Sequence, residues 1–140
     1  MRIRTYFLMA VAALVLAGIC AYVVWPTILA RTVAAHQESV TAELAKWGEE
    51  YSTIRDANEA GRAIEMLEYV QHYYVVAPGY RSDPATEVRL ESQRTATIET
   101  ILTALDQYVD EQDDRNAEAW RRQISKVLPE TGRERVAPEE

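Results

Sequence analysis

The stretch over residues 6–29, YFLMAVAALVLAGICAYVVWPTIL, carries no charged side chain and decides how the chain is organised. An α-helix rises ~1.5 Å per residue and the hydrocarbon core of a bilayer is ~30 Å thick, so ~20 apolar residues are enough to cross it. A lone apolar segment in lipid must satisfy its own backbone hydrogen bonds, which a helix does. Aromatic rings, which favour the headgroup levels, stand at both ends: Tyr6, Phe7, Tyr22 and Trp25. We therefore predict a transmembrane helix over residues 6–29, with Pro26 near its end, where a proline costs little.

Basic residues predict the orientation of this helix. Two arginines precede it within residues 1–5, whereas Arg31 on the other side is soon followed by Glu38 and Glu43. Short basic flanks stay on the cytoplasmic side of a membrane. We therefore expect residues 1–5 to form a short cytoplasmic tail of a single-pass protein. The chain from about residue 30 onward is then expected outside a bacterial inner (cytoplasmic) membrane.

The apolar stretch has three alternatives to a membrane anchor. Val33-Ala34-Ala35 is an acceptable signal-peptidase site, but the apolar run exceeds the ~7–15 residues typical of a cleaved signal peptide. Residues 16–20 resemble a lipoprotein signal, but Ile19 stands before Cys20 where a small residue is expected. A buried core helix would be shorter and would lack aromatic residues at both ends. An anchor is favoured, and cleavage of the N-terminal segment stays open.

Length and charge restrict what the external part can be. The chain has 140 residues, so about 110 follow the apolar stretch, enough for one small domain. After residue 30 it carries 13 Lys and Arg against 22 Asp and Glu, a net charge of −9. Such an acidic surface disfavours nucleic acid and anionic lipid, and favours solubility or a basic partner. Cys20 is the only cysteine, so no intrachain disulfide and no thiolate metal site can form.

Residues 31–55 show the periodicity of an amphipathic helix. One seam contains Val33, Gln37, Val40, Leu44, Trp47, Tyr51 and Ile54. About three heptads are enough for a coiled coil, so a homodimer is one interpretation. We favour packing of the seam against later helices of the same chain, because those helices also need a partner.

Three further helices are predicted. The first follows an Asp56/Glu59 capping pair and runs to about Val76, with Ala60, Ala63, Ile64, Leu67, Val70 and Tyr74 on one face. The second begins after Asp83-Pro84 and runs to about Val109. It has two apolar stripes, which suit a helix at the centre of a bundle: Val88, Thr95, Ile98, Leu102, Leu105 and Val109, and Leu90, Ile101 and Tyr108.

The final helix is short. It follows the acidic stretch Asp110–Asp114, begins near Asn116 and places Trp120, Ile124, Val127 and Leu128 on one face before Pro129 ends it. Residues 129–140 are charged and nearly devoid of apolar side chains, so we expect a disordered tail. The predicted fold is all-α: a transmembrane helix, then a small antiparallel bundle over residues 30–128 with three long helices and a short fourth.

Two resemblances accompany this pattern. Residues ~64–128 resemble the closing segment of some bacterial HEAT-like helical-repeat proteins, through Tyr73-Tyr74, the run from Gly79 to Pro84, the run from Leu90 to Arg94, Thr97-Ile98 and Ala119-Trp120. Residues ~41–72 resemble one tetratricopeptide unit, through Leu44, Trp47, Gly48, Tyr51 and Ala60, although that repeat's late proline is replaced by His72. Both resemblances imply paired antiparallel helices and a binding role without catalysis. The repeats that would precede a HEAT-like closing segment are absent from this chain.

No pattern for catalysis or for a cofactor is found. Glu68 and His72 lie four residues apart and could ligate a metal, but such a site needs three or four ligands and the HExxH spacing is absent. Counting from Asp110, an EF-hand loop fails at its glycine and glutamate positions. A GxSxG elbow and a glycine-rich phosphate loop are also absent. We expect no enzyme and no cofactor, and keep a metal-binding protein that uses Glu68 and His72 as an alternative.

Four tyrosines are concentrated near the end of the second external helix: Tyr69, Tyr73, Tyr74 and Tyr80. Because tyrosine rings pack well while their hydroxyl groups stay hydrated, such clusters are frequent at protein interfaces. We therefore predict a partner surface formed by Trp47, Tyr73, Tyr74 and Tyr80. The alternative is that these rings fill the space between the helices over residues 57–76 and 82–109. The expected function is a membrane-anchored, non-catalytic scaffold or interaction subunit. The alternative of a coiled-coil homodimer in cell-envelope assembly stays open.

Overall fold

The computed structural model describes residues 2–79 and 81–128, so Tyr80 and the expected tail over residues 129–140 lie outside the described residues. The described residues form only helices and connecting segments. In chain order these are α1 (Arg2–Ile19), a π-helical turn η1 (Cys20–Val24), α2 (Trp25–Glu50), α3 (Ala57–His72), α4 (Pro84–Asp110) and α5 (Asp114–Val127). The predicted all-α fold, with one apolar N-terminal helix and a bundle of further helices, is confirmed.

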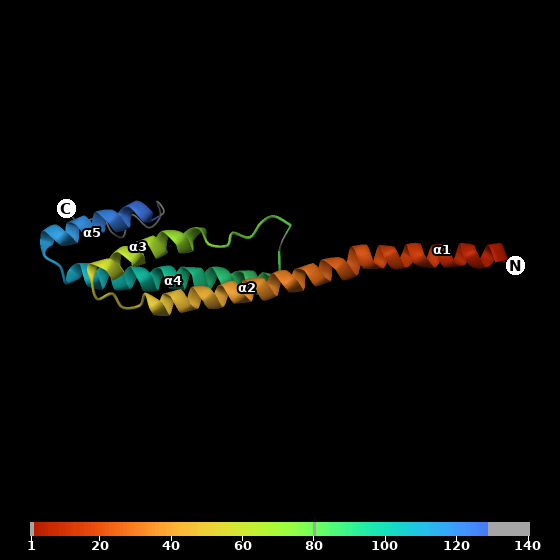
Figure 1. The fold of residues 1–140 in the computed structure, drawn as a ribbon, viewed down its shortest axis with the longest axis horizontal. Helices are drawn as coiled ribbons and strands as arrows, with labels where there is room; N and C mark the ends of the chain where they lie inside the picture. The colour runs from red at the N-terminus through yellow and green to blue at the C-terminus, as the bar shows by residue number, and fades with distance from the viewer. Residues whose placement is uncertain (1, 80, 129–140) are drawn as a thin grey trace.

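The apolar segment and the first bundle helix are one continuous helix (Figure 1). Pro26 has no N–H to donate, and its ring would clash with the carbonyl four residues earlier in an α-helix. The π-helical turn just before it relieves this conflict, because the Trp25 N–H donates to the Cys20 carbonyl five residues back. Thr27 Oγ1 donates to the Val23 carbonyl at 2.6 Å and satisfies a further acceptor. The helix therefore passes through Pro26, and no break separates residues 6–29 from the bundle.

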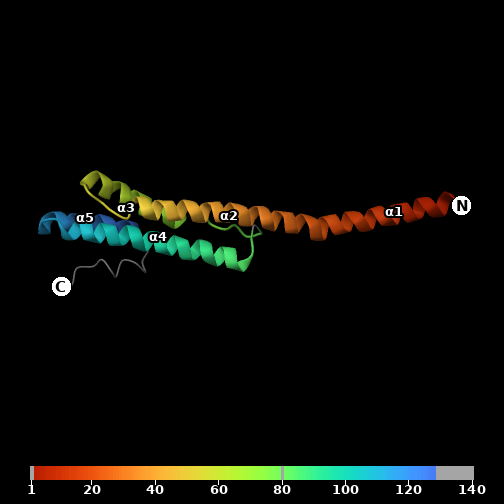
Figure 2. The same ribbon diagram turned by 90° about the horizontal axis from the view of Figure 1, so that it is seen from below.

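This helix contains the one segment of the described residues that is long and apolar enough to cross a membrane, within Tyr6–Glu50. None of its most apolar window is buried inside the protein. Tyr6, Tyr22 and Trp25 are 69%, 85% and 65% exposed. Figures 1 and 2 both show this part standing clear of the other helices. Its apolar side chains therefore have no partner surface within the described part of the chain.

Helix α4 is the centre of the bundle. Helices α2 and α3 both pack along α4, and α5 packs on α3 and α4 (Figure 2). The buried residues of α2 are Val33, Gln37, Val40, Leu44 and Gly48. The predicted α2 seam is therefore covered by a helix of the same chain. The helix ends at Glu50, so the prediction that it extends to Arg55 and includes Ile54 was wrong.

The α2 and α4 backbones come close together at Gly48. A Cβ atom at this position would lie 3.4 Å from Thr97 Oγ1 and 3.6 Å from Thr97 Cα. One turn earlier, Thr97 Oγ1 donates to the Leu44 carbonyl at 2.8 Å. A Cβ atom at this position would therefore make ordinary van der Waals contact with α4, whereas a larger side chain would meet Thr97.

The buried face of α4 differs from the prediction. Val88 is 64% exposed and Thr95 is exposed, so the first predicted stripe does not begin where we expected. The buried line along α4 includes three polar residues among its apolar ones: Thr86, Leu90, Arg94, Thr97, Ile101, Ala104, Leu105, Tyr108 and Val109. A search for apolar periodicity passes over Arg94 and Thr97, because each is buried through hydrogen bonds instead.

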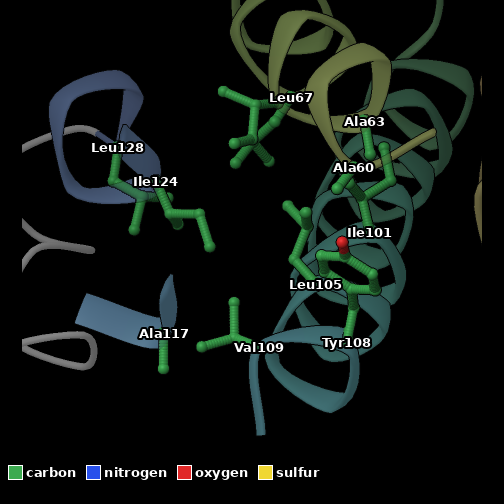
Figure 3. Close-up of a cluster of buried hydrophobic side chains, with 11 residues drawn as sticks. Ala60, Ala63, Leu67, Ile101, Leu105, Tyr108, Val109, Ala117, Ile124 and Leu128 are labelled. Atoms are coloured by element: carbon green, nitrogen blue, oxygen red, sulfur yellow. The ribbon is translucent and has the colours of Figure 1, made fainter. Parts of the chain in front are cut away.

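Two apolar clusters hold the bundle together. The first joins α3, α4 and α5 at the end far from α1, and Figure 3 shows Leu67, Leu105 and Ile124 pointing toward one another. The second joins α2, α3 and α4 through Val40, Leu44, Val70 and Leu90. The predicted inward faces of α3 and α5 are confirmed by these clusters.

Aspartate caps begin three of the helices. The Asp56 carboxylate accepts from the backbone N–H groups of Asn58 and Glu59 at 2.8 and 2.9 Å. Asp83 accepts from the Thr86 N–H at 3.0 Å ahead of Pro84, as predicted. Asp113 accepts from the Asn116 N–H at 3.0 Å. Since Asp113 is the cap, α5 begins at Asp114, two residues earlier than predicted.

Candidate protein-interaction surface

Helix α3 ends at His72, four residues earlier than predicted. Tyr73 adopts an extended conformation and Tyr74 has a φ of +52°, in the left-handed region that non-glycine residues rarely occupy. The last carbonyls of a helix have no donor within the helix itself. Here the guanidinium of Arg94 supplies the donors, to the carbonyls of Val70 at 2.9 Å, Tyr73 at 2.6 Å and Tyr74 at 3.0 Å. This tertiary cap fixes where α3 stops.

Arg94 is well suited to this position although it is only 8% exposed. Its planar guanidinium can donate to several acceptors at fixed angles. The carbonyl end of α3 carries partial negative charge, which offsets part of the cost of burying a cation. Arg94 Nε also lies 3.2 Å from Glu91 Oε2. The residue therefore joins the centre of α4 to the segment that carries the tyrosines.

Three aromatic rings meet between α2 and α3 and form what we call the aromatic surface: Trp47, Tyr69 and Tyr73. The ring centroids of Trp47 and Tyr73 are 4.8 Å apart and those of Trp47 and Tyr69 are 5.6 Å apart, both edge to face. The Tyr69 and Tyr73 rings are 5.2 Å apart. Such geometry is favourable beyond the area that the rings bury. Tyr69 is nevertheless 52% exposed, so the surface faces outward.

Glu43 fixes the position of the Tyr73 ring. The Tyr73 hydroxyl donates a hydrogen bond to Glu43 Oε2 on α2. This hydrogen bond, together with burial and the negative charge of Glu43, raises the pKa of Tyr73 to about 12. Tyr73 therefore stays a neutral hydrogen-bond donor throughout the physiological range, and it ties α3 to α2 at the rim of the aromatic surface.

The predicted surface is brought together only in part. Trp47 and Tyr73 are in contact, as predicted. Tyr74 instead packs against His36, with ring centroids 4.9 Å apart, nearer the start of α2. Tyr80 lies outside the described residues. Tyr69 was missing from the predicted surface, although it lies one turn before Tyr73 in the helix predicted over residues 57–76, which was a usable signal.

The position of the rings also corrects the alternative interpretation. The rings of Trp47, Tyr69 and Tyr73 bridge α2 and α3, whereas the alternative places the rings between α3 and α4. The α3 and α4 backbones are already joined by Arg94 and by aliphatic packing. Because α2 and α3 each pack mainly on α4, large rings span the space that remains between them.

The described residues carry no metal cluster. Glu68 and His72 are both exposed on α3. Among the side chains in residues 2–79 and 81–128 for which positions are described, no three His, Cys, Asp or Glu lie close enough to hold a metal ion together. These two residues would thus need further ligands from elsewhere to form a site of the usual three or four.

Comparison with known proteins identifies no relative. The chain matches no protein-family model, no curated protein and no solved structure.

Proposed function

We propose that this protein is a single-pass, membrane-anchored interaction subunit without catalytic activity, whose helical bundle presents the aromatic surface to a protein partner. The observation that carries the proposal is the continuity of the helix from Arg2 to Glu50. One end of it is apolar enough to cross a membrane, and the other end supplies Trp47 to the aromatic surface. Such a helix holds a binding surface at a set distance from the bilayer.

In the proposed orientation the N-terminus is cytoplasmic and the bundle lies on the outer side of a bacterial inner membrane. Arg2 and Arg4 precede the apolar segment, and the positive-inside rule keeps such flanks in the cytoplasm. The strongly acidic composition after residue 30 suits a domain that stays soluble beside the membrane. Anchoring also raises the effective concentration of the bundle near other membrane proteins.

The chemistry of the surface indicates the kind of partner. Half-exposed tyrosine and tryptophan rings offer large contact areas at low entropic cost, and these residue types are enriched where binding energy is concentrated. Carboxylates flank the rings, with Glu43 hydrogen-bonded to Tyr73 and Glu65 one turn before Tyr69. A partner with an apolar centre and a basic rim would complement this arrangement.

Site-specific photocrosslinking in intact cells tests the proposal. A photoreactive phenylalanine analogue at Tyr69 is expected to give a discrete adduct with a membrane-associated or extracytoplasmic protein. The same analogue at exposed Ser52 serves as the control and should give none. An adduct with a second copy of the chain would instead support the homodimer. Equal patterns at the two positions would remove the aromatic surface from the proposal.

Topology is tested separately. A reporter fused after Glu140 should be active only outside the cytoplasm, and the mass of the mature protein should correspond to the full chain. A mature chain that begins near His36 would mean that the apolar segment is a cleaved signal, and the anchor would then be wrong.

A further inference from the structure

The segment between α3 and α4 returns to the end of the bundle nearest the apolar helix (Figure 1). Asp83 lines a shallow depression on α2 together with Pro26, Ala30 and Arg31. Two contacts join the segment to α2 further along that helix. The Ser82 hydroxyl donates to Gln37 Oε1, and the Tyr74 ring packs on His36.

The middle of this segment is apolar and exposed to solvent. Val75 is 75% exposed, the largest exposed fraction of any large apolar side chain after residue 30 in the described residues. Ala77, Pro78 and Gly79 follow it and are also exposed. Apolar side chains held outward against water lose the stabilisation that burial would give them. Val75 and Pro78 would therefore gain stabilisation from burial against a second surface.

The position of the segment along the membrane-anchoring helix indicates that the covering surface is the bilayer. Trp25 is the last aromatic residue of the apolar stretch, and such rings favour the headgroup level. Arg31 lies six residues further on, ~9 Å along a helix. A headgroup layer extends ~5–7 Å beyond the hydrocarbon core. Asp83, where the segment enters α4, is thus level with the headgroups or just above them. The bend that precedes it reaches at least as far toward α1 (Figure 1).

The two ends of the bundle differ in charge, and the difference favours the same end approaching the membrane. Residues 31–40 and 73–90, at the end nearest the apolar helix, carry three basic and three acidic side chains. Residues 49–59 and 106–114, at the far end, carry one basic and nine acidic side chains. An anionic bilayer surface repels carboxylates and attracts arginines within about a Debye length. The end with no net charge can approach such a surface, whereas the far end is repelled.

We propose that residues 75–79 together with Arg81 form a second membrane contact, resting on the headgroups of an anionic phospholipid bilayer. This inference depends on the proposed membrane anchor. Val75 and Pro78 enter the interfacial layer, and Arg81 contacts lipid phosphates. The Arg81 side chain is 70% exposed, so its ion pair at 3.2 Å with Glu87, which is 21% exposed, leaves most of the guanidinium open to lipid.

Attachment to the bilayer at two places, the anchor helix and the second contact, would fix the orientation of the bundle. A bundle held only by a helix can tilt and swing with that helix, whereas a second contact fixes which face turns toward the bilayer. Trp47 lies 22 residues beyond Trp25, ~33 Å along the helix. The helix thus sets the height of the aromatic surface, and the second contact sets the direction in which that surface is presented.

Fluorescence quenching in vesicles containing phosphatidylglycerol tests the contact on the full chain. An environment-sensitive probe is attached either to the native Cys20 or, in a Cys20→Ala background, to Val75→Cys or to Ser52→Cys. Headgroup-labelled nitroxide lipid is expected to quench the Val75→Cys probe and not the Ser52→Cys probe. Acyl-chain nitroxide is expected to quench the Cys20 probe, which reports the anchor alone.

The outcomes separate the two proposals. If the Cys20 probe is quenched while the Val75→Cys and Ser52→Cys probes respond equally, the anchor holds and the second contact is refuted. If the Cys20 probe is not quenched, the anchor itself fails and the second contact fails with it. Arg81→Gln should reduce the ratio of surface-bound to free segment about fivefold, because one basic residue near an anionic surface is worth ~1 kcal/mol. Arg62→Gln, an exposed change on α3 that does not adjoin this segment, should leave the ratio unchanged.

Discussion

The guanidinium of Arg94 donates to the main-chain carbonyl of Tyr73 at 2.6 Å, so a buried cation on α4 determines where α3 ends and where the aromatic surface begins. The same nitrogen reaches the Val70 carbonyl at 2.9 Å, and Nη2 reaches Tyr74 at 3.0 Å. One side chain thus satisfies three acceptors that belong to the end of a helix. Stability and the candidate surface are linked through this residue.

Arg94→Met should lower the free energy of unfolding by about 3 kcal/mol, because it leaves buried carbonyls without donors. Urea denaturation of the full chain in detergent micelles, followed by far-ultraviolet circular dichroism, measures the loss. Arg89→Met on the same helix is the control, since the Arg89 side chain is 65% exposed and its partner Glu38 is 3.6 Å away. Equal effects of the two changes would contradict the assigned role of Arg94.

Gly48 and Gly61 give a second prediction about packing. Gly48→Leu should destabilise the protein by about 1–3 kcal/mol, because the added side chain must force α2 away from Thr97 on α4. Gly48→Ala adds only an atom at ordinary contact distance and should gain up to about 1 kcal/mol from helix propensity. Gly61→Leu, where nothing lies within 4 Å of an added Cβ, should be tolerated. Thermal unfolding of the variants in parallel checks this order, and a tolerated Gly48→Leu would speak against the close contact.

The hydrogen bond between Tyr73 and Glu43 is expected to be visible by titration. Glu43→Gln removes the negative acceptor that contributes most to the raised pKa of Tyr73, so the pKa should fall from about 12 toward the ordinary 10.0. Spectrophotometric titration of tyrosinate in both proteins measures the shift. Tyr73→Phe identifies which titration step belongs to Tyr73, because that step should disappear from the absorbance curve of this variant. A titration curve unaffected by Glu43→Gln would show that the two side chains are not paired in solution.

Asp106 should make stability depend on pH. Burial and the negative charge of Asp110 raise the pKa of Asp106, and Arg121 lowers it by a smaller amount. The folded protein therefore holds this proton more tightly than the unfolded chain. The stabilisation is complete below the ordinary pKa of 3.8 and is lost as the pH rises through the raised value.

Asp106→Asn should therefore raise the Tm at neutral pH, and this gain should vanish in acid. Thermal unfolding of both proteins across this pH range measures the difference. Asp114→Asn is the control, since Asp114 lies in the first turn of α5, where a negative charge is favourable. This control should bring no gain at neutral pH. A gain from Asp106→Asn that is the same at every pH would contradict the prediction.

The sequence by itself determined the properties that depend on local pattern. Charge and hydropathy along the chain predicted the apolar helix over residues 6–29, and apolar periodicity predicted the inward face of α3. Short-range hydrogen bonding predicted the helix starts at Asp56 and Asp83, because a cap needs only partners two or three residues away. These features require no knowledge of what lies opposite each helix.

Only the tertiary structure decided the features that depend on a distant partner. The end of α3 is set by Arg94, which lies more than 20 residues further along the chain. The buried line of α4 contains Arg94 and Thr97, whose burial is possible only because carbonyls of α3 and α2 face them. Tyr69 joins Trp47 for the same reason, since α2 and α3 are brought together through their common packing on α4. A polar residue becomes a core residue when another element supplies its hydrogen bonds, and local sequence does not contain that information.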